Sequence, residues 1–512
     1  MSAKMTFVLP FYDDTQELLA QVQSIHEVVG EKEIIIVDER LHRTDHLGLK
    51  QALSIDAVKY SPFAHRNRAA LFNEAMRLAR YDLVCVLPAD IYPVPEFIEA
   101  FAAAFEQPKT AMAYSDYVEE AGDRSEVKKL WPFKNNIDER FSLGYFRVYR
   151  KEVVFNEGKF NEDLNYAEEY DFRLRIQDRY EVAHVDRPLY RCVVRDTGTS
   201  DPVLSKLHSP GEGAQGGFSY LFYTPEMERE IEFVFKAYLK RIGAYLTHEN
   251  SEVAYPPDAK FDVMVSIVIP ILNRRRFIRR TIETVLQGTY QDFEILVVDN
   301  GSTDGTQEEV RSIADPRVRL IENNGTCIAD ALNRGIREAR GKYIAQLDSD
   351  DEYMPDTLET MVAYMETHPR CGLAISYYDL IDEQGRPIKE LGVIKHLEYD
   401  RNNILRVDGA GALRFFHKKV LEEFGLYNEE KYGNFGEDYD MVLKISEKYD
   451  VDRVHKVLYR YRRHPDNTDV QRPAAMKIYN KNNARQEALQ RRIRLNQKLR
   501  KDHPADEEHI PK

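Results

Sequence analysis

The sequence predicts an α/β protein with two consecutive domains of the same plan, a helical linker between them and a helix after the second domain. Three observations support this fold class. The chain has 512 residues, enough for two to four domains at roughly 150 residues each. Short apolar runs alternate with runs of helical periodicity. This alternation occurs twice, since the surroundings of Pro10 return 260 residues later around Pro270.

The first copy opens with an apolar strand at residues 6–10. Residues 16–29 are expected to form a helix, because apolar side chains recur there every three or four positions. A second strand is expected at residues 33–37, directly before Asp38. The first copy therefore begins with the strand–helix–strand order of a parallel α/β sheet.

The second copy repeats this order with a strand at 265–270, a helix capped by Asn273 and a strand at 294–298 that ends in Asp299. Further along, residues 73–90 align without a gap against residues 333–350. Such a duplication predicts two domains with one architecture.

Composition shifts predict where the domains end. We expect a first domain at 1–215, a helical linker at 216–262, a second domain at 263–472 and a basic helix or tail at 473–512. The last segment is rich in Lys, Arg and Gln and has a modest apolar side, which suggests a peripheral membrane contact. The alternative is a solvated helix packed on its own domain.

Charge and hydropathy exclude several classes of protein. The formal net charge is -14, which argues against nucleic acid as an obligatory partner, since phosphate backbones require a basic surface. No apolar run reaches the length of a membrane span, and the start of the chain lacks the pattern of a signal peptide. The four cysteines are scattered, as expected of core thiols. We therefore expect a cytoplasmic protein, with self-association into a homo-oligomer as an open hypothesis.

Acidic residues mark the strand ends of the second copy. Asp299 follows one strand, while Asp348 and Asp350 follow another, and ligands bind at the carboxyl edge of open parallel sheets. Crowded carboxylates favour a hard cation such as Mg²⁺ or Mn²⁺. Asp438 precedes a predicted helix, and His464 follows a predicted strand. A histidine within reach of the acids would complete a metal site.

Together these motifs resemble glycosyltransferase family 2, whose members are inverting nucleotide-sugar enzymes with the Rossmann-like GT-A fold. The resemblance covers roughly residues 5–200 and 263–470. It is strongest in four motifs of the second copy, which are Val265-Ser-Ile-Val-Ile-Pro270, Val298-Asp-Asn-Gly-Ser-Thr-Asp304, Leu347-Asp-Ser-Asp-Asp351 and Gly436-Glu-Asp438.

The resemblance implies a role for each matched residue. Pro270 and Asp299 would line the donor site, with Asp299 accepting a hydrogen bond from the nucleotide base. Asp348 would lie beside the ribose and the metal, and Asp350 would bind a Mn²⁺ or Mg²⁺ ion that bridges the donor diphosphate. His464 would be a second ligand to that metal or to the diphosphate.

The family's catalytic base matches Asp438, which would take the proton from an acceptor hydroxyl. One departure is Leu332, where the family often has an arginine that faces the phosphates. Binding of the sugar donor would then depend more on the metal or on the arginines at 274–276. The alternative is that these arginines form a solvated helix face.

The first copy keeps the plan but departs from the chemistry. Asp38 and Asp90 are retained, Glu169 stands at the position of Asp438, Pro88 replaces the first acid of the Asp-Ser-Asp triplet and Arg195 replaces His464. Its metal motif is degenerate. Arg195 would either neutralise phosphate directly and allow metal-independent transfer, or the domain is an acceptor-binding or dimerising scaffold.

The function implied is inverting transfer of a sugar from a nucleotide-diphosphate donor to a hydroxyl of a glycan or glycoconjugate, catalysed by the second domain, in the synthesis of a surface or capsular polysaccharide. One alternative is a bifunctional polymerase in which both domains transfer different sugars. Another is a non-catalytic carbohydrate-binding or assembly protein.

Overall fold

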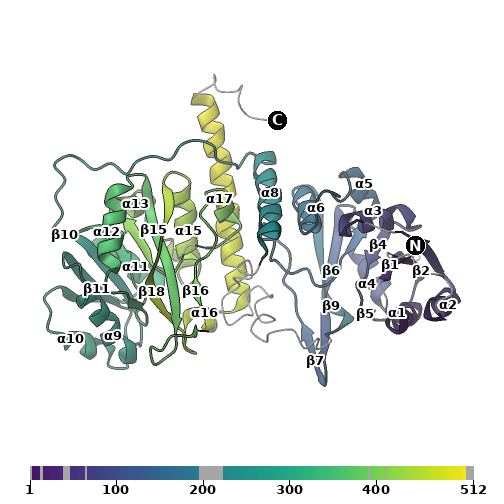
Figure 1. The fold of residues 1–512 in the computed structure, drawn as a ribbon, viewed down its shortest axis with the longest axis horizontal. Helices are drawn as coiled ribbons and strands as arrows, with labels where there is room; N and C mark the ends of the chain where they lie inside the picture. Colours follow the sequence, from purple (N-terminus) through teal and green to yellow (C-terminus); the bar gives the residue numbers. More distant parts are fainter. Residues whose placement is uncertain are drawn as a thin grey trace. The chain divides into compact units, whose positions relative to one another are not determined.

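The computed structural model describes residues 3–11, 15–38, 47–63, 66–194, 223–389, 392–409 and 411–502. The chain divides into two compact units, Met1–Tyr238 and Leu239–Lys512 (Figure 1). The division falls within helix α8 (Pro225–Arg241), which lies in the segment that the sequence assigns to the linker.

Unit 1 contains one mixed sheet with the strand order β3-β2-β1-β4-β8-β6-β9-β5, and β7 pairs with β6. Its strands are β1 (Lys4–Phe11), β2 (Glu31–Asp38), β3 (Val58–Pro62), β4 (Leu83–Val86), β5 (Ile91–Pro93), β6 (Thr110–Ala121), β7 (Arg124–Lys128), β8 (Val148–Arg150) and β9 (Glu181–Val193). Its other helices are α1 (Thr15–Glu27), α2 (Leu47–Leu53), α3 (Arg68–Leu78), α4 (Phe97–Ala104), α5 (Lys151–Asn156) and α6 (Glu168–Ile176).

Unit 2 repeats this topology, with the order β12-β11-β10-β13-β17-β15-β18-β14 and β16 paired to β15. Its strands are β10 (Val263–Ile271), β11 (Phe293–Asp299), β12 (Val318–Glu322), β13 (Gly341–Gln346), β14 (Glu352–Tyr353), β15 (Cys371–Ile381), β16 (Val393–Ile394), β17 (Arg414–His417) and β18 (Asp450–Arg462). Its helices are α9 (Arg275–Leu286), α10 (Thr306–Arg311), α11 (Ile328–Glu338), α12 (Thr357–Thr367), the 3-10 turn η3 (Asn403–Leu405), α13 (Lys418–Glu423), α14 (Glu429–Tyr432), α15 (Glu437–Ser446), α16 (Thr468–Gln471) and α17 (Ala474–Asp502). The predicted tandem α/β architecture is confirmed.

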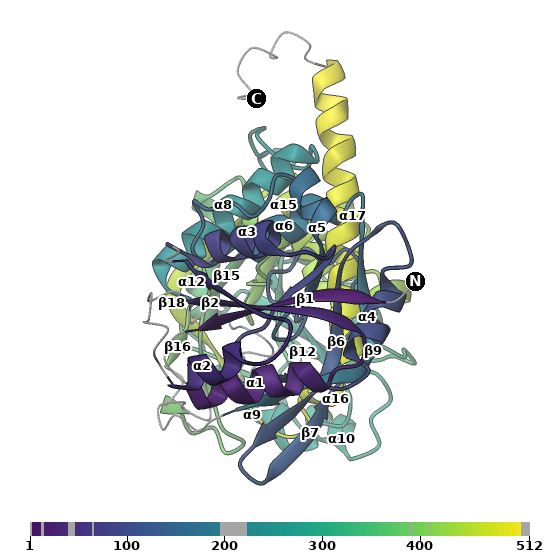
Figure 2. The same cartoon turned by 90° about the vertical axis from the view of Figure 1, so that its right-hand side faces the viewer.

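Helices cover both faces of each central sheet, which explains why its inner strands are apolar on both sides. Figure 2 shows α1 and α2 on one side of β1 and β2, and α3 on the other. In unit 2, α9 and α12 pack on one face through a continuous apolar core. On the other face α11 lies close to β10, because Gly335 has no Cβ, and a Cβ there would lie 2.4 Å from Val268 Cγ1.

The predicted cap of the first helix of unit 2 is wrong. Helix α9 begins at Arg275 and its N-cap residue is Arg274, without a side-chain cap. Asn273 adopts φ +54°, and its Oδ1 atom accepts a hydrogen bond of 2.8 Å from the Thr303 amide. The carboxylate of Asp304 accepts the Arg275 amide instead, at 3.1 Å. The loop after β11 therefore caps α9 from outside the helix.

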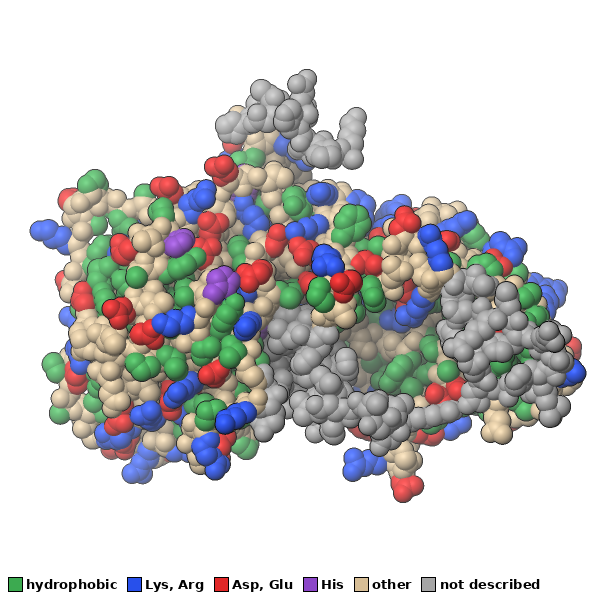
Figure 3. Space-filling model, viewed as in Figure 1, with side chains coloured by type: hydrophobic (Ala, Val, Ile, Leu, Met, Phe, Trp, Pro, Cys, Tyr) green, Lys and Arg blue, Asp and Glu red, His purple; other side chains and the backbone are tan. Residues whose placement is uncertain are grey.

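Other surface and core features agree with a globular chain. All four cysteines are buried and unpaired, as predicted. No helix in the described part of the chain is both long enough and apolar enough to span a membrane. On the face drawn in Figure 3, acidic and basic side chains of the described residues are interspersed.

Two buried histidines make the stability of unit 2 dependent on pH. His417 is 3% exposed, and its Nδ1 atom lies 3.1 Å from the Tyr255 hydroxyl. Burial lowers the pKa of His417 to about 3, and nearby Lys342 acts in the same direction. Burial also lowers the pKa of His396 to about 3. The unfolded chain therefore binds protons between pH 6.5 and pH 3 that the folded unit excludes.

We predict that these two histidines make the free energy of unfolding fall as the pH decreases below 6.5, each by about 2 kcal/mol at pH 5. His417→Gln should remove its share of the loss between pH 7 and pH 5 and keep a partner for Tyr255. Urea unfolding at both pH values measures the difference, with the exposed His368→Gln as control. An unchanged loss in His417→Gln would contradict the prediction.

Candidate functional site in unit 2

The predicted site residues of unit 2 gather where β10, β11 and β13 end. Parallel pairing aligns Pro270 with Val298 and Ile271 with Asp299, so that both strand ends lie at one edge of the sheet. Pro270 is half-buried, whereas Asp299 is fully buried.

Asp299 holds the loop that follows β11. Its carboxylate accepts hydrogen bonds from the Gly301 amide at 3.3 Å, the Ser302 amide at 3.1 Å and Gln307 Nε2 at 2.5 Å. The loop is thereby shaped around the acid. The sequence contained no signal for the contact with Gln307.

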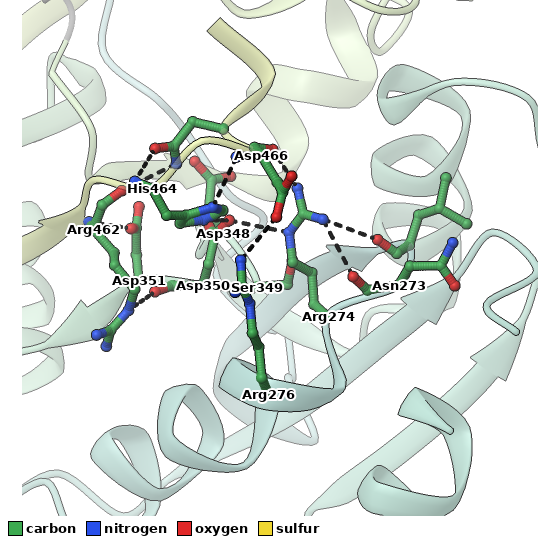
Figure 4. A network of polar contacts seen from close by, with 12 residues as sticks. Asn273, Arg274, Arg276, Asp348, Ser349, Asp350, Asp351, Arg462, His464 and Asp466 are labelled. Carbon is green, nitrogen blue, oxygen red and sulfur yellow. Dashed lines mark hydrogen bonds and ion pairs between the residues drawn. The ribbon is translucent and has the colours of Figure 1, made fainter. Parts of the chain in front are cut away.

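Asp350, His464 and Arg274 form a compact ion-pair cluster (Figure 4). One carboxylate oxygen, Asp350 Oδ2, lies 2.9 Å from His464 Nε2 and 3.1 Å from Arg274 Nε. Burial raises the pKa of Asp350, but the histidine and the guanidinium outweigh it, and the net pKa lies below its usual value. The two predicted metal ligands, Asp350 and His464, therefore lie side by side. In this structure Arg274 balances the negative charge of Asp350.

Burial and neighbouring charges shift the pKa of Asp348. Burial raises its pKa to about 6, with Asp350 and Asp438 acting in the same direction and Arg414 in the opposite one. Asp348 therefore interacts electrostatically with Asp350, which follows β13, and with Asp438 at the start of α15.

Asp351 has a structural role. Its carboxylate accepts hydrogen bonds of 2.7 Å from the Tyr459 hydroxyl and from the Arg462 amide. Burial raises its pKa well above the usual value, and Asp350 adds to the shift. Of the three crowded acids, Asp351 thus faces β18, and the other two remain for a ligand.

The side-chain atoms of Asp350 and His464 are suitable ligands for a hard divalent cation. No group of three or more His, Cys, Asp or Glu side chains is already arranged as a metal site among the described residues. However, the Asp350 carboxylate and the His464 imidazole are adjacent, and carboxylate oxygens with an imidazole are suitable ligands for Mn²⁺. Arg274 occupies the same oxygen of Asp350, so a cation bound there would replace the guanidinium.

Asp438 and Glu437 occupy different environments at the start of α15, which follows Gly436 at φ +93°. The side chain of Asp438 is 30% exposed and forms an ion pair with Arg414. Glu437 is buried, and its Oε2 atom has no hydrogen-bond partner among the described residues. Burial raises the pKa of Glu437 well above its usual value, and Asp438 contributes. Asp438 is thus the accessible carboxylate of the pair.

Arg414 is a site residue that the sequence analysis missed. Antiparallel pairing aligns Arg414 of β17 with Gln346 of β13, which places the guanidinium between the strand end and α15. Burial lowers the pKa of Arg414, but Asp438 and Asp348 outweigh it and raise the net value. The available signal was the first copy, where Arg147 precedes the corresponding strand β8.

Unit 1 contains a related but different cluster. Asp38 is fully buried and accepts a hydrogen bond of 2.6 Å from Tyr60. Asp90 adopts φ +62°. Glu169 accepts hydrogen bonds from Arg68 at 2.6 Å and Arg147 at 3.4 Å. Arg195 lies outside the described residues.

The electrostatics of Glu169 follow from these partners. Burial raises its pKa, but Arg147 and Arg68 outweigh that effect and keep the net pKa below its usual value. An arginine from the equivalent strand thus pairs with the acid at the start of the equivalent helix in both units.

The chain is similar in sequence to several known proteins. Chondroitin synthase from Escherichia coli is 24% identical over 546 residues, covering 94% of this chain and 74% of that protein. Hyaluronan synthase from Pasteurella multocida is 30% identical over 211 residues, covering 41% of this chain and 21% of that protein. The chain therefore spans about a fifth of this second relative. A structure of S. aureus TarS 1-349 with UDP-GlcNAc is 17% identical, covers 41% of this chain and 61% of that one, and has a TM-score of 0.35.

The model of the family described as "Glycosyl transferase family 2" matches residues 6–160 and 266–425. These two matches fall one in each unit. The two units are tandem Rossmann-like GT-A domains, and the chain belongs to glycosyl transferase family 2.

Proposed function

We propose that unit 2 transfers a sugar, with inversion, from a nucleotide-diphosphate donor to a hydroxyl of a glycan or glycoconjugate acceptor. The observation that supports this most is that Asp299, Asp348 and Asp350 lie at strand ends of one sheet, with His464 beside Asp350 and the accessible Asp438 at the start of α15. The likeness to chondroitin and hyaluronan synthases supports a growing polysaccharide as the acceptor.

The donor side of this site would comprise Pro270, Asp299, Asp348 and Asp350. Asp299 would accept a hydrogen bond from the nucleotide base, and Asp348 would lie beside the ribose. Asp350 and His464 would hold Mn²⁺ or Mg²⁺, which when bound neutralises the diphosphate as it leaves. Arg274, released from Asp350, would remain beside the phosphates as a second positive charge.

The acceptor side would be served by Asp438. Its carboxylate is accessible and would take the proton from the acceptor hydroxyl during attack on the anomeric carbon. Arg414 would hold the carboxylate in one orientation and separate its charge from that of Asp348. Glu437 is buried behind it and would support the helix start without taking part in proton transfer.

Unit 1 has no acid at position 88, so we propose that it works without the metal chemistry of unit 2. The Arg147–Glu169 pair favours a retained acceptor-side arrangement and hence the bifunctional alternative, in which unit 1 transfers a second sugar. The scaffold alternative predicts nucleotide binding by unit 2 alone. Cytoplasmic location, homo-oligomer formation and membrane contact of the basic tail stay predictions.

The first prediction of this model concerns metal dependence. Asp350→Ala should abolish the Mn²⁺-dependent part of UDP binding and lower sugar transfer by about 10²-fold or more, because the cation loses its carboxylate ligand. Calorimetry with UDP, with and without chelator, measures binding, and a panel of nucleotide sugars measures transfer. Asp90→Ala, at the same position of unit 1, is the matched control. Full activity of Asp350→Ala in chelator would refute metal dependence.

The second prediction concerns the base. Asp438→Asn preserves shape but removes the charge, so it should keep UDP–Mn²⁺ affinity and lower turnover by about 10²-fold or more. Glu437→Gln is the neighbouring control and should retain most of the turnover. Normal turnover in Asp438→Asn, or a loss confined to Glu437→Gln, would assign the proton transfer to another group.

The third prediction tests which unit carries the chemistry. Arg414→Met should lower turnover by about 10-fold or more, because Asp438 loses the partner that orients it, while UDP–Mn²⁺ affinity stays close to wild type. Arg147→Met makes the same change in unit 1 and should affect only a second activity, if one exists. The opposite result, with transfer lost in Arg147→Met alone, would place the measured reaction in unit 1.

A further inference from the structure

One face of helix α17 is buried against the rest of unit 2. Its inward face includes Arg485 and Arg492, which are 2% and 0% exposed. Arg485 donates hydrogen bonds to the carbonyl of Leu405 at 2.9 Å and of Arg406 at 3.1 Å. Arg492 donates to the carbonyl of Arg401 at 2.7 Å. Buried guanidinium groups are costly to leave unpaired, so these contacts bind the helix firmly to the segment around η3.

The same helix also holds the loop that precedes the proposed base. Asn480 Nδ2 donates a hydrogen bond of 2.7 Å to the Phe435 carbonyl, three positions before Asp438. Gly436 adjoins α17, since a Cβ there would lie 3.4 Å from the Cβ of Asn480, which is ordinary van der Waals contact. The start of α15 is therefore packed directly against α17.

Lys481 connects this loop to a second one. Its ammonium group forms an ion pair with Asp408 and lies 5.4 Å from the centroid of the Phe435 ring. Asp408 precedes Gly409 and the left-handed Gly411, at φ +46°. One side chain of α17 thus contacts two loops that precede Asp438 in the chain.

The residue next to the proposed base belongs to the same network. The Tyr439 hydroxyl donates to the carbonyls of Ile404 at 2.8 Å and Leu405 at 3.0 Å, and it lies 3.3 Å from Arg485 Nε. The segment around η3, the start of α15 and α17 therefore form one hydrogen-bonded unit.

Unit 1 uses its own following helix in a comparable way. The carboxylate of Glu230, in α8, accepts hydrogen bonds from the amides of Asn165 at 2.9 Å, Tyr166 at 2.6 Å and Ala167 at 2.8 Å. These amides directly precede Glu168 and Glu169. In each unit, a helix after the sheet thus holds the segment before the acid pair, although the side chains that make the contact differ.

We propose that α17 completes the acceptor side of the site in unit 2, and that Lys481 is a positioning residue. Lys481 contacts both the loop that contains Asp408 and the loop that contains Phe435. It thereby sets the position of Asp438 relative to the acceptor. This inference rests on the proposed role of Asp438 as the base. Lys481 itself has no contact with Asp299, Asp348 or Asp350 among the described contacts, so donor binding should not depend on it.

The test compares Lys481→Met, Asp408→Asn and the double variant with Lys498→Met, which changes an exposed lysine near the end of the same helix. Transfer is measured with a panel of nucleotide sugars on chondroitin and hyaluronan oligosaccharides, and UDP–Mn²⁺ binding by calorimetry. Lys481→Met should lower kcat about tenfold and raise the acceptor KM, with unchanged UDP affinity. The double variant should be no worse than either single one, because both remove the same ion pair.

Two further measurements separate positioning from general destabilisation. Amide exchange should accelerate about tenfold in residues 403–413 and 433–440 of Lys481→Met, and stay unchanged in α9 and α12. Reversing the pair, with Lys481→Glu and Asp408→Lys together, should recover slow exchange and part of kcat.

The possible failures have different meanings. Unchanged exchange in both segments, or faster exchange with normal kcat and acceptor KM, would overturn the positioning role. Normal turnover in Asp438→Asn would instead overturn the proposed base, whatever Lys481→Met does. Loss of UDP affinity in Lys481→Met would also contradict the inference, because the donor site is assigned to the strand ends of β10, β11 and β13.

Discussion

The site in unit 2 depends on how negative charge at one edge of the sheet is balanced. Parallel strands end together, so their terminal acids lie in a small, largely buried volume, where burial and then mutual repulsion raise the pKa values of Asp348 and Asp351. Several of these acids have a cationic or hydrogen-bonding partner. Arg274 and His464 face Asp350, and Arg414 faces Asp438. Asp351 is directed away to β18.

Acidic residues that are adjacent in the sequence have different surroundings in the structure. Asp350 is paired with His464 and Arg274, whereas Asp351 is held by Tyr459 and the β18 backbone. Asp438 is accessible, whereas Glu437 is buried. Differences in surroundings, rather than in residue type, thus distinguish neighbouring carboxylates.

The two units show which parts of the plan were kept after duplication. Strand order is the same, and each unit pairs an arginine with an acid at the start of a helix, Arg147 directly before β8 in unit 1 and Arg414 at the start of β17 in unit 2. The donor side differs, because Pro88 stands where unit 2 has Asp348. In each unit, a helix that follows the sheet also holds the segment before the acid pair. The contact is made by Glu230 in unit 1 and by Asn480 in unit 2.

The sequence by itself determined the alternation of strands and helices, the duplication and the placement of Asp299 and Asp350 at strand ends, because these follow from local periodicity and from a repeat visible in the printed residues. It could not determine the cap of α9, where Asp304 from a separate loop replaced the expected Asn273. The partnership of Arg414 with Asp438, the burial of Glu437 and the contacts of Lys481 were likewise decided only by the tertiary structure. Each of these contacts joins segments that are distant in sequence, such as β13 with β17 or η3 with α17. The packing of the whole unit brings these segments together, and neither segment alone carries a periodic signal of the contact.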